Sequence, residues 1–277
     1  MRHLSLLCIL FLLVGPGAAL ELDGKGKLRI GRVAYTAPEK ILISHNPLAL
    51  HLKQQLGIED VEFVLFVSYG DIHNRLMAGE LDLGWLGTAY FGSREEQNYE
   101  PLVRPNWNGR LSYRGQIFTR SDSTVEKVED LEGMKVAFVS EHSSSGYIFP
   151  QSLMRKAGLE LEDLEGHSFL DKHNAVAYAV FTRQFDAGAS YYGLFQDGGD
   201  IRDHLHKSHF RIIAVTEEIS NEPLVIRKVF SREVKEKVSL AFQSAASSGV
   251  LSSIKGLMGF HEAANEDYQN ARDLLNP

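Results

Sequence analysis

The sequence has little cysteine and no excess of basic residues. Cys8 is the one cysteine among 277 residues, which excludes disulfide scaffolds and cysteine-ligated metal sites. Acidic residues outnumber basic ones by 36 to 29, a formal net charge of −7, and a nucleic-acid surface needs a basic field. We therefore expect no nucleic-acid partner. With 44% hydrophobic and 23% charged residues, the composition is that of a folded globular protein.

Common catalytic and cofactor motifs are also missing. The sequence contains no G-x-S-x-G, no phosphate-binding P-loop, no HExxH and no GxGxxG. The DHLHKSH stretch places His204, His206 and His209 close together, but spacings of two and three do not bring three rings onto one helical face. We interpret it as a solvated segment. The sequence thus predicts no enzyme, no cofactor and no metal.

Long apolar runs are absent beyond the first twenty residues. Residues 4–14 are apolar, and the small, helix-breaking GPGAA follows at 15–19. This pattern predicts a secretory signal peptide over residues 1–19, with cleavage near Ala19; an uncleaved anchor is the alternative. Cys8 lies within the apolar run and not at its end, which argues against a lipoprotein. We expect an exported protein, most simply periplasmic.

Strand-like and helix-like segments alternate along the rest of the chain. Four segments rich in β-formers, at 28–35, 61–67, 81–86 and 134–139, are separated by stretches with helical patterns. Such alternation predicts an α/β architecture with mostly parallel sheets. The length allows two lobes of roughly 100–150 residues each.

The segment His142-Ser143-Ser144-Ser145-Gly146, here called the serine turn, is the strongest candidate site. It follows the predicted strand 134–139 and opens a predicted helix. Free N–H groups and the dipole at a helix start attract anions, and serine hydroxyls add donors. Plain N-capping by one serine is the alternative. The turn contains no Lys or Arg, so neutral donors would hold an anion there.

Three further residues are candidates only in combination. Tyr69 starts a predicted helix, Tyr113 lies on a predicted strand, and Glu222 precedes a proline. Taken singly, such a tyrosine is typical of packing and such a glutamate of a solvated loop.

Several stretches together resemble the phosphate/phosphonate (PhnD-type) periplasmic substrate-binding proteins of ABC importers. They are GELDLGWLGTAY at 79–90, DLEGMKVAFVSEHSSSGYIFP at 130–150, the segment 173–180 followed by FDAGA at 185–189, and NEPLVIRK at 221–228. They occur in the order of the family and span nearly all of the chain after residue 28.

The resemblance implies a two-lobed, type 2 binding-protein fold that closes on a ligand in the cleft between its lobes. Lobe one would hold residues 25–119 and 218–277, and lobe two residues 120–217. A phosphoryl or phosphonyl group would sit at the serine turn. The ligand-binding residues implied by the motifs are Tyr69, Tyr113, Ser143, Ser144, Ser145, His173 and Glu222.

Two departures from the family narrow the expected ligand. Residues 190–193, SYYG, contain no acid where aminoethylphosphonate binders carry one for the amine, so we expect no amino-phosphonate. Glu222 stands where the family usually has Asp. A carboxylate facing an anion is repulsive unless a proton lies between them. We therefore expect a phosphorus oxyanion with a P–OH, and rejection of sulfate.

The implied partners are the small oxyanion and an ABC permease in the inner membrane, and a monomer suits a diffusing carrier. A sensing subunit for a membrane kinase would have the same fold and remains an alternative. A binder of an organic sulfonate or carboxylate also remains open. So does a secreted enzyme that uses Ser145 with His142 or His173 as base.

Overall fold

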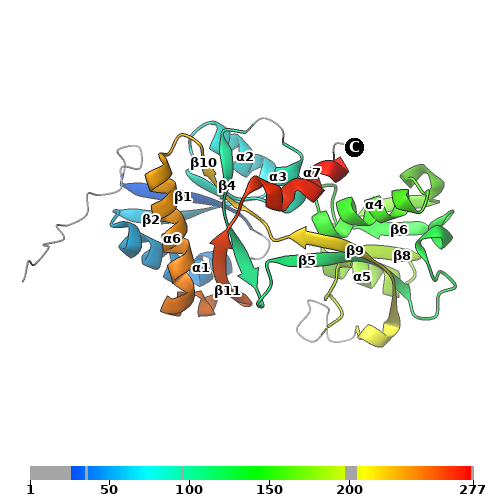
Figure 1. Ribbon diagram of the computed structural model, residues 1–277. Coiled ribbons are helices and arrows are strands. Elements are labelled where there is room, and N and C mark those ends of the chain that lie inside the picture. Colours follow the sequence, from blue (N-terminus) through cyan, green and yellow to red (C-terminus); the bar gives the residue numbers. More distant parts are fainter. Residues whose placement is uncertain (1–25, 35–36, 95–96, 197–204, 276–277) are drawn as a thin grey trace, which may run out of the picture.

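The computed structural model describes residues 26–34, 37–94, 97–196 and 205–275. The signal peptide expected over residues 1–19 lies outside these ranges, as does His204. Figure 1 shows two lobes, each built on its own β-sheet. The expected two-lobed α/β fold is confirmed.

Lobe one is the six-stranded sheet with its helices. The strand order is β11-β4-β10-β3-β1-β2. Its strands are β1 (Lys27–Val33), β2 (Asp60–Phe66), β3 (Leu83–Trp85), β4 (Tyr99–Trp107), β10 (Leu224–Arg227) and β11 (Leu257–Glu262). Its helices are α1 (Pro38–Leu56), α2 (Tyr69–Met77), α3 (Thr88–Gly92) and α6 (Arg232–Ser248). The helices α1 and α6 share one large apolar core with the sheet, and α2 packs in a second core.

Strand β1 shows how the sequence places side chains on these two cores. Leu28, Ile30 and Arg32 alternate along it and are all buried in the same direction, toward the core under α1. Gly31 faces the other way, where Leu81 and Ile72 come too close for any side chain. The apolar face of β1 thus ends in a buried arginine.

Lobe two is the five-stranded sheet with its helices. The strand order is β7-β6-β8-β5-β9. Its strands are β5 (Ser112–Arg120), β6 (Lys135–Phe138), β7 (Gly166–Phe169), β8 (Ala187–Tyr191) and β9 (Phe210–Ser220). Its helices are α4 (Phe149–Lys156) and α5 (His173–Phe181), and a π-helical turn (Ser144–Ile148) leads into α4. Short 3-10 turns occupy Val128–Leu131, Leu161–Asp163 and Lys207–His209 in lobe two, and Val250–Ser253 and Asn265–Tyr268 in lobe one.

The expectation of mostly parallel sheets needs correction, because both sheets are mixed. Strands β1, β2 and β3 pair in parallel, as do β6, β7 and β8. The remaining pairs, which involve β4, β5, β9, β10 and β11, are antiparallel. The parallel halves are those joined through helices, where the alternating pattern is informative. The antiparallel halves contain the strands that leave and re-enter each lobe.

Two long strands carry the chain between the lobes. Both β5 and β9 belong to the five-stranded sheet along their whole lengths, Ser112–Arg120 and Phe210–Ser220. The boundaries expected at 119/120 and 217/218 therefore fall inside these strands, so the chain changes sheets before Ser112 and after Ser220. A sequence pattern indicates that a strand is present, but not which sheet it joins.

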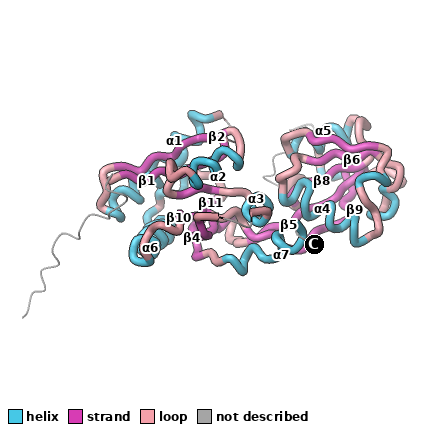
Figure 2. Tube along the Cα trace, turned by 90° about the horizontal axis from the view of Figure 1, so that it is seen from above, coloured by secondary structure: helices cyan, strands magenta, loops and turns pink. Residues whose placement is uncertain are grey.

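The carboxyl-terminal helix α7 (Gln269–Leu275) closes the junction between the lobes. Figures 1 and 2 show it beside α3, near the point where the chain passes between the lobes through β5 and β9. Ala271 of this helix shares a small apolar core with Ala89 of lobe one and with Phe149 and Ile219 of lobe two. The site described below lies next to this core.

None of the described helices combines the length and the apolar composition that a membrane crossing requires.

Candidate ligand-binding site

The serine turn folds as a capped helix start. Ser143 is the N-cap of the π-helical turn, and its hydroxyl oxygen accepts the Gly146 N–H at 3.1 Å. A Cβ on Gly146 would lie 2.4 Å from Cγ2 of Val139, so only glycine lets the turn approach the end of the preceding segment this closely. The capping alternative thus holds for Ser143, and Ser144 and Ser145 are left for other partners.

Ser144 connects the two lobes. Its side chain is buried, and its hydroxyl oxygen accepts the backbone N–H of Ala89 at 2.9 Å. Ala89 belongs to α3 in lobe one, where the Thr88 hydroxyl donates to the Ser220 carbonyl at 2.7 Å. The edge-on contact of the Tyr90 and His142 rings, with centroids 5.5 Å apart, joins the same elements. The serine turn therefore faces lobe one and not the outer surface.

Tyr113 lies against the serine turn from β5. Its hydroxyl is hydrogen bonded with Ser145 and Ser144. Burial raises the pKa of the Tyr113 hydroxyl, the Glu222 carboxylate raises it further, and the two serine hydrogen bonds act in the opposite direction. The phenol consequently stays protonated and remains able to donate at any physiological pH.

Tyr69 and Glu222 approach the same point from lobe one. Ser68 caps α2 by accepting the Asp71 N–H at 3.2 Å, which fixes Tyr69 as the first residue of the helix. The Tyr69 hydroxyl donates to the Glu222 carboxylate, and burial together with this carboxylate raises the pKa of the phenol. The Tyr69 ring packs so closely on Gly87 that a Cβ there would lie 2.7 Å from Cε2.

Arg32 is the residue that sequence reasoning missed. Its guanidinium lies 3.6 Å from the Glu222 carboxylate and 3.9 Å from the centroid of the Trp85 ring. Its side chain is only 6% exposed. The expectation that neutral donors alone surround the anion must be modified, because a buried cation stands behind Glu222. One sequence signal could have identified Arg32. It is a charged residue on the otherwise apolar face of β1, at the carboxyl end of that strand, where ligand sites of α/β sheets lie.

His173 lies beside the carboxyl end of β8. It is the first residue of α5, its Nδ1 lies 2.8 Å from the Ser190 hydroxyl, and its ring meets the Tyr191 ring edge-on at 5.0 Å between centroids. These contacts, with the first two residues of the SYYG segment, orient the ring within lobe two.

Five of the seven predicted residues form one connected group, here called the hydroxyl cluster. Tyr69 and Glu222 come from lobe one, and Tyr113, Ser144 and Ser145 from lobe two. Hydrogen bonds link Tyr69 to Glu222 and Tyr113 to both serines, and Tyr113 also interacts electrostatically with Tyr69 and Glu222. Ser143 and His173 are placed by the cap and by β8 instead. The arrangement offers several hydroxyl donors beside one carboxylate paired with one arginine.

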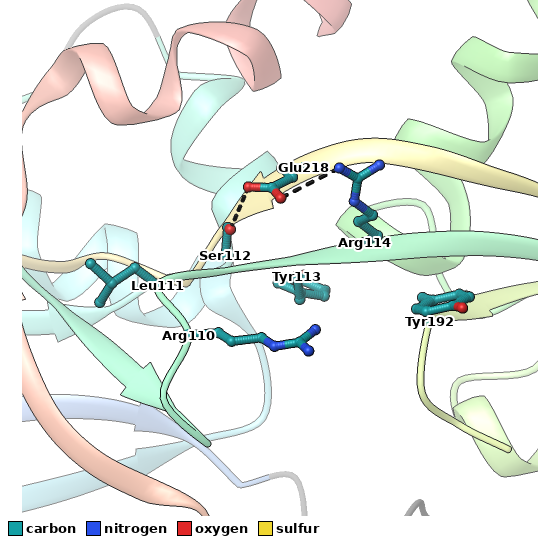
Figure 3. Close-up of a pocket in the computed structure, with 7 residues that line it drawn as sticks. All are labelled: Arg110, Leu111, Ser112, Tyr113, Arg114, Tyr192 and Glu218. Carbon is teal, nitrogen blue, oxygen red and sulfur yellow. Dashed lines mark hydrogen bonds and ion pairs between the residues drawn. The ribbon is translucent and has the colours of Figure 1, made fainter. Parts of the chain in front are cut away.

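A cavity of about 420 Å³ adjoins the cluster at Tyr113 (Figure 3). It follows the start of β5 and is lined by Arg110, Leu111, Ser112, Tyr113, Arg114, Tyr192 and Glu218. This volume falls within the range of about 300–1,000 Å³ that is usual for small-molecule sites. Tyr113 is the residue common to the cluster and the cavity, so the two are parts of one region between the lobes.

A comparison with known protein families matches most of the chain to one family model. A family model described as ABC transporter, phosphonate, periplasmic substrate-binding protein matches residues 30–268. The matched segment contains every residue of the hydroxyl cluster, together with Ser143, His173 and Arg32.

Two relatives with assigned names are distant in sequence. A phosphate-import protein, PhnD, of Mycolicibacterium smegmatis is 25% identical over 215 residues, which cover 73% of this chain and 67% of the relative. A probable ABC transporter phosphite binding protein, PhnD1, of Prochlorococcus marinus is 22% identical over 170 residues, 58% of this chain. The latter match spans 57% of the length of that relative.

The fold is that of solved binding proteins. The structure of PhnD1 from Prochlorococcus marinus in complex with methylphosphonate superimposes with a TM-score of 0.73 at 16% sequence identity. The match covers 90% of this chain and 97% of the other. The likeness supports the two-lobed architecture described above.

Proposed function

The chain belongs to the family of phosphonate-binding periplasmic substrate-binding proteins of ABC transporters, and from that premise we propose that it captures a small phosphorus oxyanion for import. The proposed ligands are phosphate, phosphite or a phosphonate. One observation carries the proposal: hydroxyl groups from both lobes meet in the hydroxyl cluster. The family consists of substrate-binding proteins and not of enzymes, in agreement with the sequence prediction.

The serines and tyrosines are the proposed donors to the phosphoryl oxygens. The Tyr113 hydroxyl interacts with the hydroxyls of Ser144 and Ser145. Hydroxyl groups can rotate to change hydrogen-bond partners, so these three can turn toward an anion when it binds. Hydrogen bonds to a charged acceptor are stronger than those between neutral groups. Replacing hydrogen bonds between hydroxyl groups by hydrogen bonds to an anion therefore favours the ligand-bound state.

Glu222 and Arg32 set the charge that the ligand meets. The Glu222 carboxylate accepts from Tyr69 and lies beside Arg32, and its remaining acceptor positions suit a P–OH hydrogen. Arg32 offsets the repulsion between the carboxylate and an incoming anion. We propose that the pair favours a protonated phosphorus oxyanion over sulfate.

Ser143 and His173 have supporting roles in this proposal. Ser143 preserves the turn through its bond to Gly146, and His173, held by Ser190, would offer its other ring nitrogen to the ligand from lobe two. Both residues match positions of the family pattern.

The names of the relatives agree with this ligand class. One is a phosphate-import protein and another a probable phosphite binding protein, and the solved neighbour holds methylphosphonate. All three ligands are tetrahedral phosphorus oxyanions, which is the class that the hydroxyl cluster is proposed to hold.

Export and delivery complete the proposal. The family is periplasmic, and we propose that residues 1–19 are a cleaved signal peptide and that the mature protein acts as a monomer. Its partner would be an inner-membrane ABC permease. A sensor kinase would receive the same liganded form, but the family description and the import role named for one relative favour transport.

One specific observation keeps an organic sulfonate as a second candidate. Arg32 stands 3.6 Å from Glu222, and a positive charge at this place lowers the penalty for an anion that has no proton to give.

Titration calorimetry with phosphate, phosphite, methylphosphonate, sulfate and methanesulfonate tests the proposal. We expect one ligand per chain and tighter binding of the phosphorus anions than of either sulfur anion. Preferential binding of methanesulfonate would establish the second candidate instead, and the absence of binding by every phosphorus anion would refute the proposed function.

A further inference from the structure

The cavity beside the hydroxyl cluster is larger than a bare oxyanion requires. It encloses about 420 Å³, whereas the share of one water molecule in the liquid is about 30 Å³. The ring of Tyr113 lines it, and the hydroxyl of the same residue bonds with Ser144 and Ser145. A ligand whose phosphoryl group lies at the serines therefore has room for a substituent on the far side of Tyr113.

Most of the charges around this cavity are already paired. The Glu218 carboxylate accepts the Ser112 hydroxyl at 2.7 Å and lies 3.4 Å from a nitrogen of Arg114. Arg114 also donates to the Thr216 carbonyl at 3.3 Å. These hydrogen bonds, with Ser112 first, lower the pKa of Glu218. The charge of this carboxylate is already offset by the neighbouring Arg114.

Arg110 is different. Its guanidinium makes no hydrogen bond or ion pair with another residue in the described part of the chain. Figure 3 shows its side chain extending beneath Tyr113 toward Tyr192, while Glu218 and Arg114 lie on the other side of β5. The charge of Arg110 acts on Glu218 from a distance. On its own side of the cavity, near the rings of Tyr113 and Tyr192, this guanidinium is the main charged group.

Backbone contacts hold these walls in place. The side-chain amide of Asn221 donates to the carbonyls of Arg110 and Pro105, both at 2.8 Å. Asn221 directly precedes Glu222, so the same residue anchors the Arg110 turn and the carboxylate of the cluster. On the opposite wall, the Tyr192 N–H donates to the Arg114 carbonyl at 2.7 Å. Walls fixed in advance reduce the ordering cost of binding.

We propose that the cavity is a second subsite that takes the organic substituent of the ligand, and that Arg110 selects a substituent with a second anionic group. The ligand class is then an organophosphorus compound with a carboxylate or another phosphoryl group at the end of a short chain. Tyr113 and Tyr192 pack on the chain, and Arg110 pairs with the terminal anion. This inference rests on the proposed function, since it extends the phosphoryl site.

The test compares three probes by titration calorimetry on the full-length mature chain: 3-phosphonopropionate, methylphosphonate and 2-aminoethylphosphonate. The wild-type protein should bind 3-phosphonopropionate roughly tenfold more tightly than methylphosphonate, the gain expected for one charge-assisted contact, and 2-aminoethylphosphonate most weakly. In Arg110→Gln, the ratio of the first two affinities should fall to about one, because the replacement keeps a polar side chain but removes the charge.

Arg232→Gln is the matched control. Arg232 is an exposed arginine on α6, paired with Glu236, and its loss changes the net charge equally, so this variant should keep the wild-type ratio. Equal wild-type affinity for 3-phosphonopropionate and methylphosphonate, or an unchanged ratio in Arg110→Gln, would overturn the second subsite while leaving the proposed function intact. Binding of none of the three probes would overturn the second subsite, and it would overturn the proposed function as well only if phosphate and phosphite also failed to bind.

Discussion

Glu222 is the residue that we propose decides which oxyanions the site accepts. Its carboxylate is fixed from two sides, by the hydroxyl of Tyr69 and by the guanidinium of Arg32. A ligand with a P–OH adds a third hydrogen bond, whereas an anion without a proton brings two negative groups together. We therefore propose that selectivity at this site depends on whether the anion carries a proton.

Replacing the carboxylate by an amide tests this explanation. Glu222→Gln should narrow the affinity gap between phosphate and sulfate by roughly tenfold, since the amide can donate to an unprotonated oxygen and carries no charge. Titration calorimetry with both anions measures the gap. Glu262→Gln, on an exposed position of β11, should leave it unchanged. A gap of the same size in Glu222→Gln would show that the carboxylate does not contact the ligand.

His45 illustrates a buried residue whose charge state couples to stability. It is fully buried in α1, its Nδ1 lies 2.9 Å from the Ile41 carbonyl, and its ring meets Phe63 edge-on. Burial, and next the positive charge of Arg32, lower its pKa to about 4. The folded state therefore holds this imidazole neutral.

The sign of the resulting pH dependence is fixed. Between about pH 6.5 and pH 4 the unfolded chain protonates His45 and the folded protein does not, so the stabilisation is complete above about pH 6.5 and is lost as the pH falls toward 4. The full effect is roughly 3 kcal/mol. Urea unfolding should give a shallower pH dependence in His45→Phe and an unchanged one in His261→Phe. An equal dependence in wild type and His45→Phe would contradict the assignment.

The serine turn is the element on which the proposed binding depends, and its shape requires one glycine. The turn must pass so near Val139 that a Cβ on Gly146 would approach its side chain to 2.4 Å and the Ser143 hydroxyl to 2.8 Å. Val139 is itself buried in an apolar core of lobe two. The sequence indicated the turn from its serines, and the structure adds the reason for the glycine that follows them.

Gly146→Ala should destabilise the protein by roughly 1–3 kcal/mol, the usual cost of overpacking, and should also weaken binding of methylphosphonate. Thermal unfolding and titration measure the two effects. Gly166→Ala is the matched control, because a Cβ at that strand position meets open space. A stable Gly146→Ala variant with unchanged affinity would show that the turn tolerates another shape.

At the scale of elements, the sequence predicted what is local and left open what is distant. The starts of the helices at Tyr69 and at the serine turn could be predicted, because capping residues and glycines act over only a few residues. The pairing of Arg32 with Glu222 joins residues 190 positions apart in the chain. No local sequence pattern predicts such a contact. It requires the fold, which brings β1 and the segment before β10 to the same edge of the sheet in lobe one.

For the whole molecule, the two-lobed architecture was predictable because nearly the entire chain carries family motifs in order. The strand directions were less so, since β5 and β9 cross between lobes and pair antiparallel. The Arg110 cavity was not predictable either, because its walls come from a hairpin turn, from β5 and from the segment after β8. These parts meet only through the fold.

We propose above all that hydroxyls of the serine turn bind a tetrahedral phosphorus anion between the lobes. Its most direct test is titration of methylphosphonate into wild type, the double variant Ser144→Ala with Ser145→Ala, and the control Ser252→Ala, each checked by circular dichroism for folding. The account predicts roughly a hundredfold weaker binding in the double variant, from two lost charged hydrogen bonds, and wild-type affinity in the control. A folded double variant with wild-type affinity would contradict it.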